Sequence, residues 1–110
     1  MPIHTIPANS RGLTKSNWLK SYHSFSFGDY YDPLKKGFGK LRVLNEDVIG
    51  PSEGFPMHSH ENMEIITLIL KGRLEHGDSI GNYGLLKEGQ MQRMSAGSGI
   101  RHSEFNSSKD

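Results

Sequence analysis

Residues 54–72 read GFPMHSHENMEIITLILKG, and two histidines stand there at the start of the longest apolar run in the chain. Successive side chains of an extended strand point to opposite faces, so His58 and His60 would aim at the same point. Two neutral imidazoles that converge from one strand supply half of a metal site, because imidazole binds Zn, Cu, Fe and Ni. A lone His-x-His is commonly a pair of exposed loop histidines, so a second pair is needed.

A second pair with the same spacing follows the glycine-rich segment AGSG at residues 96–99. His102 and Glu104 are again two residues apart, so both side chains would lie on one face of a strand. Two strands that each offer two ligands to one cavity predict a four-ligand metal site. Its members would be His58, His60, His102 and Glu104.

Length and composition restrict the classes of function. The chain has 110 residues, which is enough for about one domain. Its 13 basic and 12 acidic residues give a net charge of +1, which argues against a nucleic-acid or membrane surface as the main partner. It has no cysteine, so any metal must be held by His, Asp or Glu. Residues 1–12 lack a signal-peptide core and residues 65–70 are too few to span a bilayer, so we expect a cytoplasmic protein.

Short apolar alternations separated by glycine and proline turns predict an all-β fold. The run at residues 63–70 is apolar on both faces and rich in β-branched side chains, which predicts a strand buried on both sides. An edge strand is expected at residues 3–6, and further strands are expected at 22–27, 41–49, 73–76, 83–86 and 90–94.

The remaining histidines have local explanations. His23 shares a strand face with Phe25 and Phe27, and we interpret it as a partly buried side chain with local hydrogen bonds. A role in lining the metal cavity is the less favoured alternative for it. His4 and His76 have no partner at ligand spacing, so we predict no metal-binding role for either.

Two groups of residues resemble the cupin motifs. The order Gly54, His58, His60, Glu64 and Gly72 resembles the first motif, and Gly89, Gly97, His102 and Asn106 resemble the second. The second group has serine and alanine where many cupins have a proline before the glycine. The stretches 18–33, 37–47, 54–70 and 92–106 together resemble the pirin family, especially its bacterial quercetinase-like branch. This resemblance covers nearly the whole chain.

The resemblance implies a cupin barrel, a double-stranded β-helix of jelly-roll type, with residues 1–110 as one pirin-like N-terminal domain. Pirins of this kind hold one metal through three histidines and a glutamate, which correspond to His58, His60, His102 and Glu104. Many other cupins use the glutamate of the first motif, here Glu64, which stays an alternative ligand, supporting residue or general base. One divalent ion is implied, with Fe(II) favoured and Mn(II), Ni(II), Co(II) and Zn(II) also compatible.

Similarity to pirins also implies quercetin 2,3-dioxygenase activity on a small aromatic, flavonol-like substrate. In that mechanism Glu64 or Glu104 takes a proton from a flavonol hydroxyl, and the flavonolate binds the metal. Dioxygen then cleaves the ring with release of carbon monoxide. Phe25, Phe27 and Phe55 are candidate walls for the substrate, although core packing explains each equally well. The alternative function is a non-catalytic metal-binding regulatory module, because animal pirins act as iron-dependent transcriptional co-regulators.

The chain departs from the family in length, because typical pirins have two cupin domains and are more than twice as long. It stops eight residues after His102, and no strand is expected after Asn106. We therefore expect a barrel that is incomplete at its C-terminal end, with the strand of His102 left as an exposed sheet edge. Three explanations compete for the short length: a fragment of a longer protein, a single-domain relative of the family, or a homo-oligomer in which another chain completes the barrel. The homo-oligomer is the favoured expectation.

Overall fold

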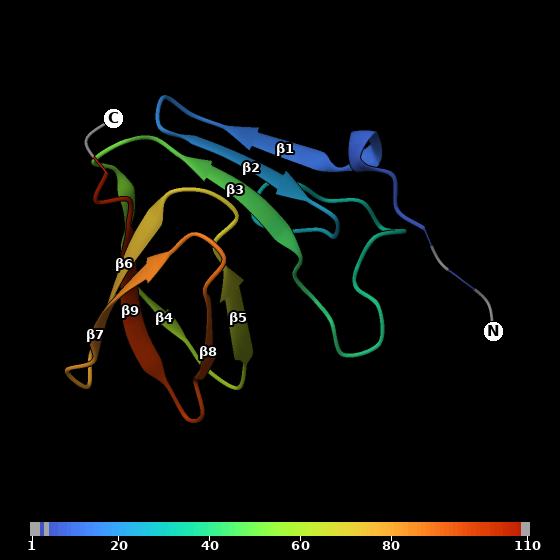
Figure 1. The fold of residues 1–110 in the computed structure, drawn as a ribbon. Coiled ribbons are helices and arrows are strands. Elements are labelled where there is room, and N and C mark those ends of the chain that lie inside the picture. The colour runs from blue at the N-terminus through green and yellow to red at the C-terminus, as the bar shows by residue number, and fades with distance from the viewer. Residues whose placement is uncertain (1–2, 4, 109–110) are drawn as a thin grey trace. The chain divides into compact units, whose positions relative to one another are not determined.

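Short antiparallel strands make up the protein (Figure 1). The computed structural model describes residue 3 and residues 5–108. The strands are β1 (Gly12–Lys15), β2 (Leu19–His23), β3 (Asn45–Ile49), β4 (Gly54–His60), β5 (Glu64–Leu68), β6 (Arg73–Asp78), β7 (Tyr83–Lys87), β8 (Met91–Ser95) and β9 (Ile100–Phe105). The described residues contain no α-helix, and one 3-10 helix covers Ala8–Ser10. The all-β prediction is confirmed, and no helix in this part of the chain is long and apolar enough to cross a membrane.

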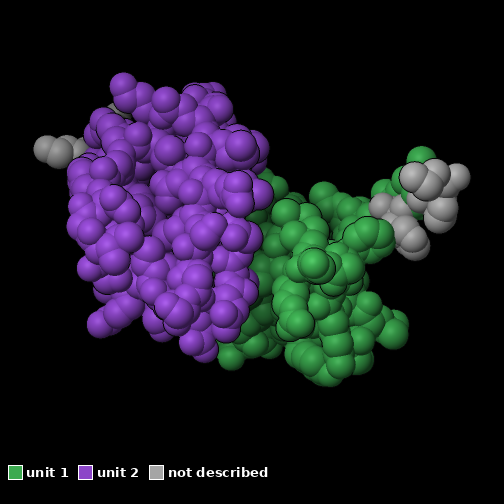
Figure 2. Space-filling model, turned by 90° about the horizontal axis from the view of Figure 1, so that it is seen from below, with its two compact units in different colours: residues 1–49 green, residues 50–110 purple. Residues whose placement is uncertain are grey.

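The chain divides into two compact units, residues 1–49 and residues 50–110, which Figure 2 shows in different colours. In the first unit, β1, β2 and β3 form a three-stranded antiparallel sheet with β2 in the centre. The sequence patterns do not predict β1, because Gly12–Lys15 has no apolar alternation. Its strand conformation comes from pairing with β2, which is a tertiary effect.

His23 lies at the centre of the first unit, with only 2% of its surface exposed. Its Nε2 atom lies 2.8 Å from the Thr14 hydroxyl, and its Nδ1 atom lies 2.8 Å from the Asn45 side-chain oxygen. The ring stacks against Phe27 and Tyr30 at centroid distances of 5.3 and 5.9 Å. The prediction of local hydrogen bonding is confirmed, because both ring nitrogens have partners within this unit.

Three sequence expectations for the first unit are wrong in their extent. The strand expected at 22–27 instead covers Leu19–His23 as β2, and Phe27 makes only an isolated bridge with Tyr30. The edge strand expected at residues 3–6 does not form among the described residues, since Ile3, Thr5 and Ile6 are not in a strand. His4 lies outside the described residues. The strand expected at 41–49 begins only at Asn45, because Leu41 instead makes an isolated bridge with Phe38 in the preceding turn.

The second unit contains two antiparallel sheets. Four strands form one sheet in the order β4-β9-β6-β7, and β5 pairs with β8 in a separate two-stranded sheet. The strands of residues 50–108 do not close into one barrel, as expected. However, β9 pairs with β4 on one side and with β6 on the other, as Figure 1 also shows. The expectation that the strand of His102 is an exposed edge is therefore wrong, because the return of β6 covers it.

The burial of β5 also differs from the expectation. Exposed and half-buried side chains alternate along Glu64–Leu68, and the side chains of Ile66 and Leu68 are largely exposed. The apolar sequence of this strand predicts burial of both faces, but only the face of Ile65 and Thr67 is partly buried.

Self-association that would complete the barrel remains a prediction, and a measurement of molar mass in solution would test it.

Candidate metal centre

The pairing of β4 with β9 sets the positions of the histidines. Phe55 pairs with Glu104 and His58 pairs with His102, so β4 has one residue more than β9 between these two pairs. The resulting β-bulge includes residues 56–57, and the proline there has no backbone N–H to contribute to the ladder. The bulge therefore places His58 directly opposite His102.

Close approach of the two strands depends on Gly54. A Cβ atom at this position would collide with the backbone carbonyl of Glu104 and the Cα atom of Phe105. Glycine is the residue that allows two backbones to approach so closely. The first residue of the cupin-like motif thus keeps both ligand-bearing strands together.

Three imidazoles converge as the spacing predicts. The His102 Nε2 atom lies 2.7 Å from the His58 Nε2 atom and 3.0 Å from the His60 Nε2 atom. One ligand atom from each of the three residues lies within 4.8 Å of the other two. Two imidazole nitrogens bound at about 2.1 Å to one ion, at right angles, are about 3.0 Å apart. The observed distances therefore fit nitrogen atoms that share one metal ion.

The tautomer of His58 suits this role. Its Nδ1 atom lies 2.8 Å from the Pro56 carbonyl oxygen, which can only accept a hydrogen bond. The proton therefore resides on Nδ1, and the lone pair of Nε2 points to the cluster. On His102, which is 2% exposed, the buried Nδ1 atom has no hydrogen-bond partner among the residues that the structure describes.

Burial lowers the pKa of two of the three clustered histidines, His60 and His102. Desolvation, followed by the nearby charges of His58, His60 and His76, lowers the pKa of His102 from 6.5 to about 4. Desolvation and the charge of His58 also lower the pKa of His60. Metal ions bind the neutral form of imidazole, so protons compete weakly for these nitrogens at pH 7.

Glu104 lies next to the cluster. Its Oε1 atom is 3.6 Å from the His102 Nε2 atom, and its side chain is 19% exposed. Because His102 and Glu104 are two residues apart on β9, both side chains lie on the same face of the sheet. A carboxylate at this distance is within a small side-chain movement of an ion held by the three imidazoles.

Glu64, the competing glutamate, has different surroundings. The Ser95 hydroxyl donates to its carboxylate oxygens at 2.7 and 2.8 Å, and the Arg93 Nε atom lies 3.4 Å from Oε2. The hydrogen bond from Ser95 is the main reason that its pKa is lowered. The side chain is exposed on β5 and is not part of the cluster of three histidines.

Sequence reasoning missed the residues beside the cluster. That His76 has no metal-binding role stays a prediction, but its ring lies beside the cluster, with its centroid 5.2 Å from that of His102. His76 pairs in register with Glu104, and Asp78 pairs with His102. The signal was present in the sequence, since His76 and Asp78 are also two residues apart in a strand. Sequence alone does not show that this strand adjoins β9.

The open antiparallel sheets with three converging imidazoles define a protein of the cupin type. A family model described as Pirin matches residues 7–110. The chain therefore belongs to the pirin family. The quercetin 2,3-dioxygenase of Escherichia coli K12 is 52% identical over 106 residues, which are 96% of this chain and 46% of that protein. A pirin-like protein of Caulobacter vibrioides is 50% identical over 104 residues, which are 94% of this chain and 45% of that protein.

Solved structures agree with this assignment. The crystal structure of YhhW from Escherichia coli has a TM-score of 0.91 and 52% identity, covering 94% of this chain and 44% of that one. YhhW in complex with nickel(II) has a TM-score of 0.90 and 53% identity, covering 93% and 44%. The pirin and cupin fold expected from the sequence is thus confirmed. The chain spans about half the length of the curated relatives that it matches.

Proposed function

We propose that His58, His60 and His102 hold one divalent metal ion and that Glu104 is the fourth ligand. The proposal depends chiefly on the two Nε2 distances of 2.7 and 3.0 Å from His102. The carboxylate of Glu104 is 3.6 Å from the same atom, whereas Glu64 is held by Ser95. Three neutral imidazoles and one carboxylate suit Fe(II), Mn(II), Co(II), Ni(II) or Zn(II). Fe(II) is the sequence-based expectation, and a related pirin binds nickel(II).

We further propose that the chain is a metal-dependent dioxygenase that cleaves flavonols, because a relative that is 52% identical is named quercetin 2,3-dioxygenase. The bound metal would supply Lewis-acid and redox chemistry. Glu104 would accept the proton of the substrate hydroxyl, since it adjoins the cluster. Hydrogen bonding from Ser95 lowers the pKa of Glu64, which makes this carboxylate a weaker proton acceptor. Glu104 is therefore the better candidate base.

Turnover of quercetin by the full chain tests the proposal. The protein is loaded separately with Fe(II), Mn(II) and Ni(II), and loss of quercetin, uptake of dioxygen and release of carbon monoxide are measured together. The expected result is one carbon monoxide for each dioxygen consumed. His58→Ala should abolish turnover, whereas Arg101→Ala, which changes an exposed residue next to His102 in the chain, should not.

Two outcomes would contradict parts of the proposal. Turnover that is unchanged in His58→Ala would show that the site is wrong. Tight metal binding without any flavonol turnover would instead support the regulatory module.

A further inference from the structure

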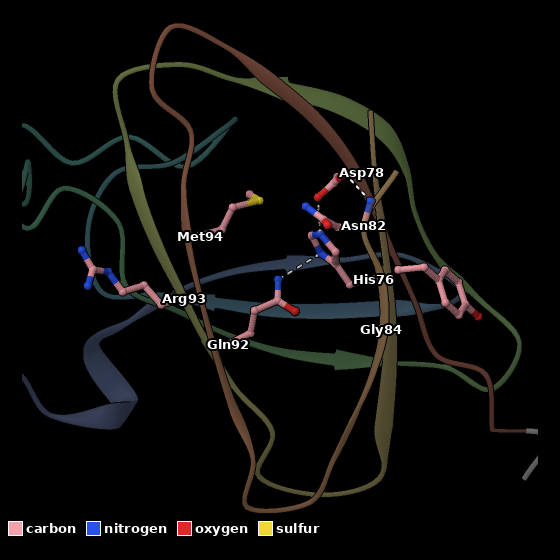
Figure 3. A pocket seen from close by; sticks show the side chains of 8 residues that line it. His76, Asp78, Asn82, Gly84, Gln92, Arg93 and Met94 are labelled. Carbon is pink, nitrogen blue, oxygen red and sulfur yellow. Dashed lines mark hydrogen bonds and ion pairs between the residues drawn. The ribbon is translucent and has the colours of Figure 1, made fainter. Parts of the chain in front are cut away.

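A pocket in the second unit lies next to the histidine cluster. This pocket has a volume of about 220 Å³, and strands β6, β7 and β8 form its walls (Figure 3). It is lined by His76, Asp78, Asn82, Tyr83, Gly84, Gln92, Arg93 and Met94. None of the three clustered histidines lines it. His76 lines the pocket, and its ring centroid lies 5.2 Å from that of His102.

His76 has a defined tautomer in this pocket. The Gln92 side-chain Nε2 atom lies 3.1 Å from the His76 Nδ1 atom, and Figure 3 shows the two side chains pointing toward one another. An amide nitrogen can only donate, so Nδ1 must be the acceptor. The ring proton therefore resides on Nε2. Only 7% of the His76 side chain is exposed, so this N–H group has little access to bulk water.

The His76 N–H group faces a buried carboxylate at an unusual distance. Asp78 Oδ2 lies 3.7 Å from His76 Nε2, which is beyond hydrogen-bonding range, and 4% of the Asp78 side chain is exposed. The other oxygen, Oδ1, accepts hydrogen bonds from the backbone N–H groups of Ile80 and Asn82, both at 3.0 Å. This turn fixes the carboxylate, so Asp78 does not close the gap by itself.

The distance between these two atoms suits one particular chemical group. An oxygen atom can lie about 2.8 Å from both Nε2 and Oδ2, because two ordinary hydrogen-bond lengths are together long enough to span the 3.7 Å between these atoms. It must accept from His76 and donate to Asp78. A hydroxyl does both, whereas an ether or carbonyl oxygen can only accept.

We propose that this pocket binds a phenolic ring whose hydroxyl group bridges His76 and Asp78. Met94 supplies apolar wall, and its thioether makes favourable contacts with an aromatic ring. The volume is below the roughly 300 Å³ at which pockets for drug-sized ligands begin, so one ring fits rather than a whole polycyclic ligand. That this ring belongs to a flavonol rests on the proposed function, but the phenol site itself does not.

The binding test uses the full 110-residue chain as purified, with two small probes of similar shape. 4-Methylphenol carries the required O–H donor, and 4-methylanisole replaces it with a methyl ether. We expect 4-methylphenol to bind at least about tenfold more tightly, because the ether leaves Asp78 without a donor. Amide and methyl NMR signals of Gly84, Gln92 and Met94 should move on titration. Equal affinities, or shifts confined to other residues, would overturn the proposal.

Variants identify the atoms involved. Asp78→Asn places a second donor opposite His76, so we expect the affinity for 4-methylphenol to fall by about 10- to 100-fold. Glu88→Gln makes the same change of charge in the exposed turn between β7 and β8 and should leave the affinity unchanged. Unchanged affinity in Asp78→Asn would refute the assignment.

A second variant covers the case in which Asp78→Asn disturbs the turn. Gln92→Met removes the donor that fixes the His76 tautomer. It should weaken the binding of 4-methylphenol and leave the affinity for 4-methylanisole unchanged. Equal effects on the two probes would contradict the proposed hydrogen bond. Because these assays measure binding without turnover, a failure of the dioxygenase proposal does not affect their result, and they can fail while quercetin is still cleaved.

Discussion

His23 and His102 are equally buried, with 2% of each residue exposed, yet their surroundings are opposite. Both ring nitrogens of His23 have a neutral hydrogen-bond partner at 2.8 Å, from Thr14 and Asn45. On His102, Nε2 lies 2.7 and 3.0 Å from other imidazoles, and the buried Nδ1 has no hydrogen-bond partner within the described part of the chain. Buried polar groups are normally satisfied, so an exception points to function. We infer that His23 stabilises the first unit and that His102 binds a ligand.

The largest expected effect distinguishes the two histidines by metal affinity. His102→Ala removes the imidazole shared by both short contacts, so we expect the dissociation constant for Ni(II) to rise at least about 100-fold. Loss of a residue that only hydrogen-bonds to a metal ligand typically raises a dissociation constant by about 10- to 100-fold. His23→Ala should change it by less than about threefold. Isothermal titration calorimetry on both variants measures the difference. Equal losses would show that the comparison does not separate structure from function.

The second largest expected effect is on folding stability, where the change at His23 should cost more than the change at His102. His23→Ala removes a fully buried ring and leaves the Thr14 hydroxyl and the Asn45 side-chain oxygen without their ring partner, so we expect the free energy of unfolding to fall by about 2 to 3 kcal/mol. His102→Ala in the metal-free protein should cost less, because it removes an unsatisfied buried atom. Urea denaturation in the presence of a chelator measures both values. A larger loss for His102→Ala would contradict the stated cause.

Sequence reasoning succeeded where the argument needed only local periodicity. The parity of His58 and His60, and of His102 and Glu104, follows from the strand repeat, and the three imidazoles meet as predicted. Features that depend on strand order were missed. The position of β9 between β4 and β6, and hence the proximity of His76, requires knowledge of non-local pairing. The bulge between Phe55 and His58 is likewise a property of two strands.

The two glutamates provide a third, smaller contrast. Glu104→Gln removes the charge 3.6 Å from His102 Nε2, so we expect about tenfold weaker Ni(II) binding. Glu64→Gln alters an exposed carboxylate bound by Ser95 and should change the affinity by less than about twofold. Both are isosteric changes, which makes each the control for the other. A larger effect of Glu64→Gln would favour the ligand pattern of other cupins.

The smallest expected effect is the pH dependence of metal-free stability. The pKa of His102 is about 4 in the folded chain because the ring is desolvated and lies near other imidazoles, whereas the ordinary value is 6.5. The unfolded chain therefore binds this proton first as the pH falls. The contribution of neutral His102 is fully present above about pH 6.5, and it decreases between pH 6.5 and pH 4. Below that range this residue causes no further loss, since both states are protonated.

The urea midpoint of the chelated protein, measured at intervals from pH 7.5 to pH 4, tests this direction. We expect the midpoint to decrease over the acid part of the range and to decrease less steeply in His102→Ala, which lacks the titrating group. Other groups titrate in both proteins, so the difference between the two curves isolates the contribution of His102. A midpoint that rises as the pH falls, in the wild type but not in the variant, would mean that the cluster is stabilised by protonation. That result would contradict a set of neutral imidazoles prepared for a metal ion.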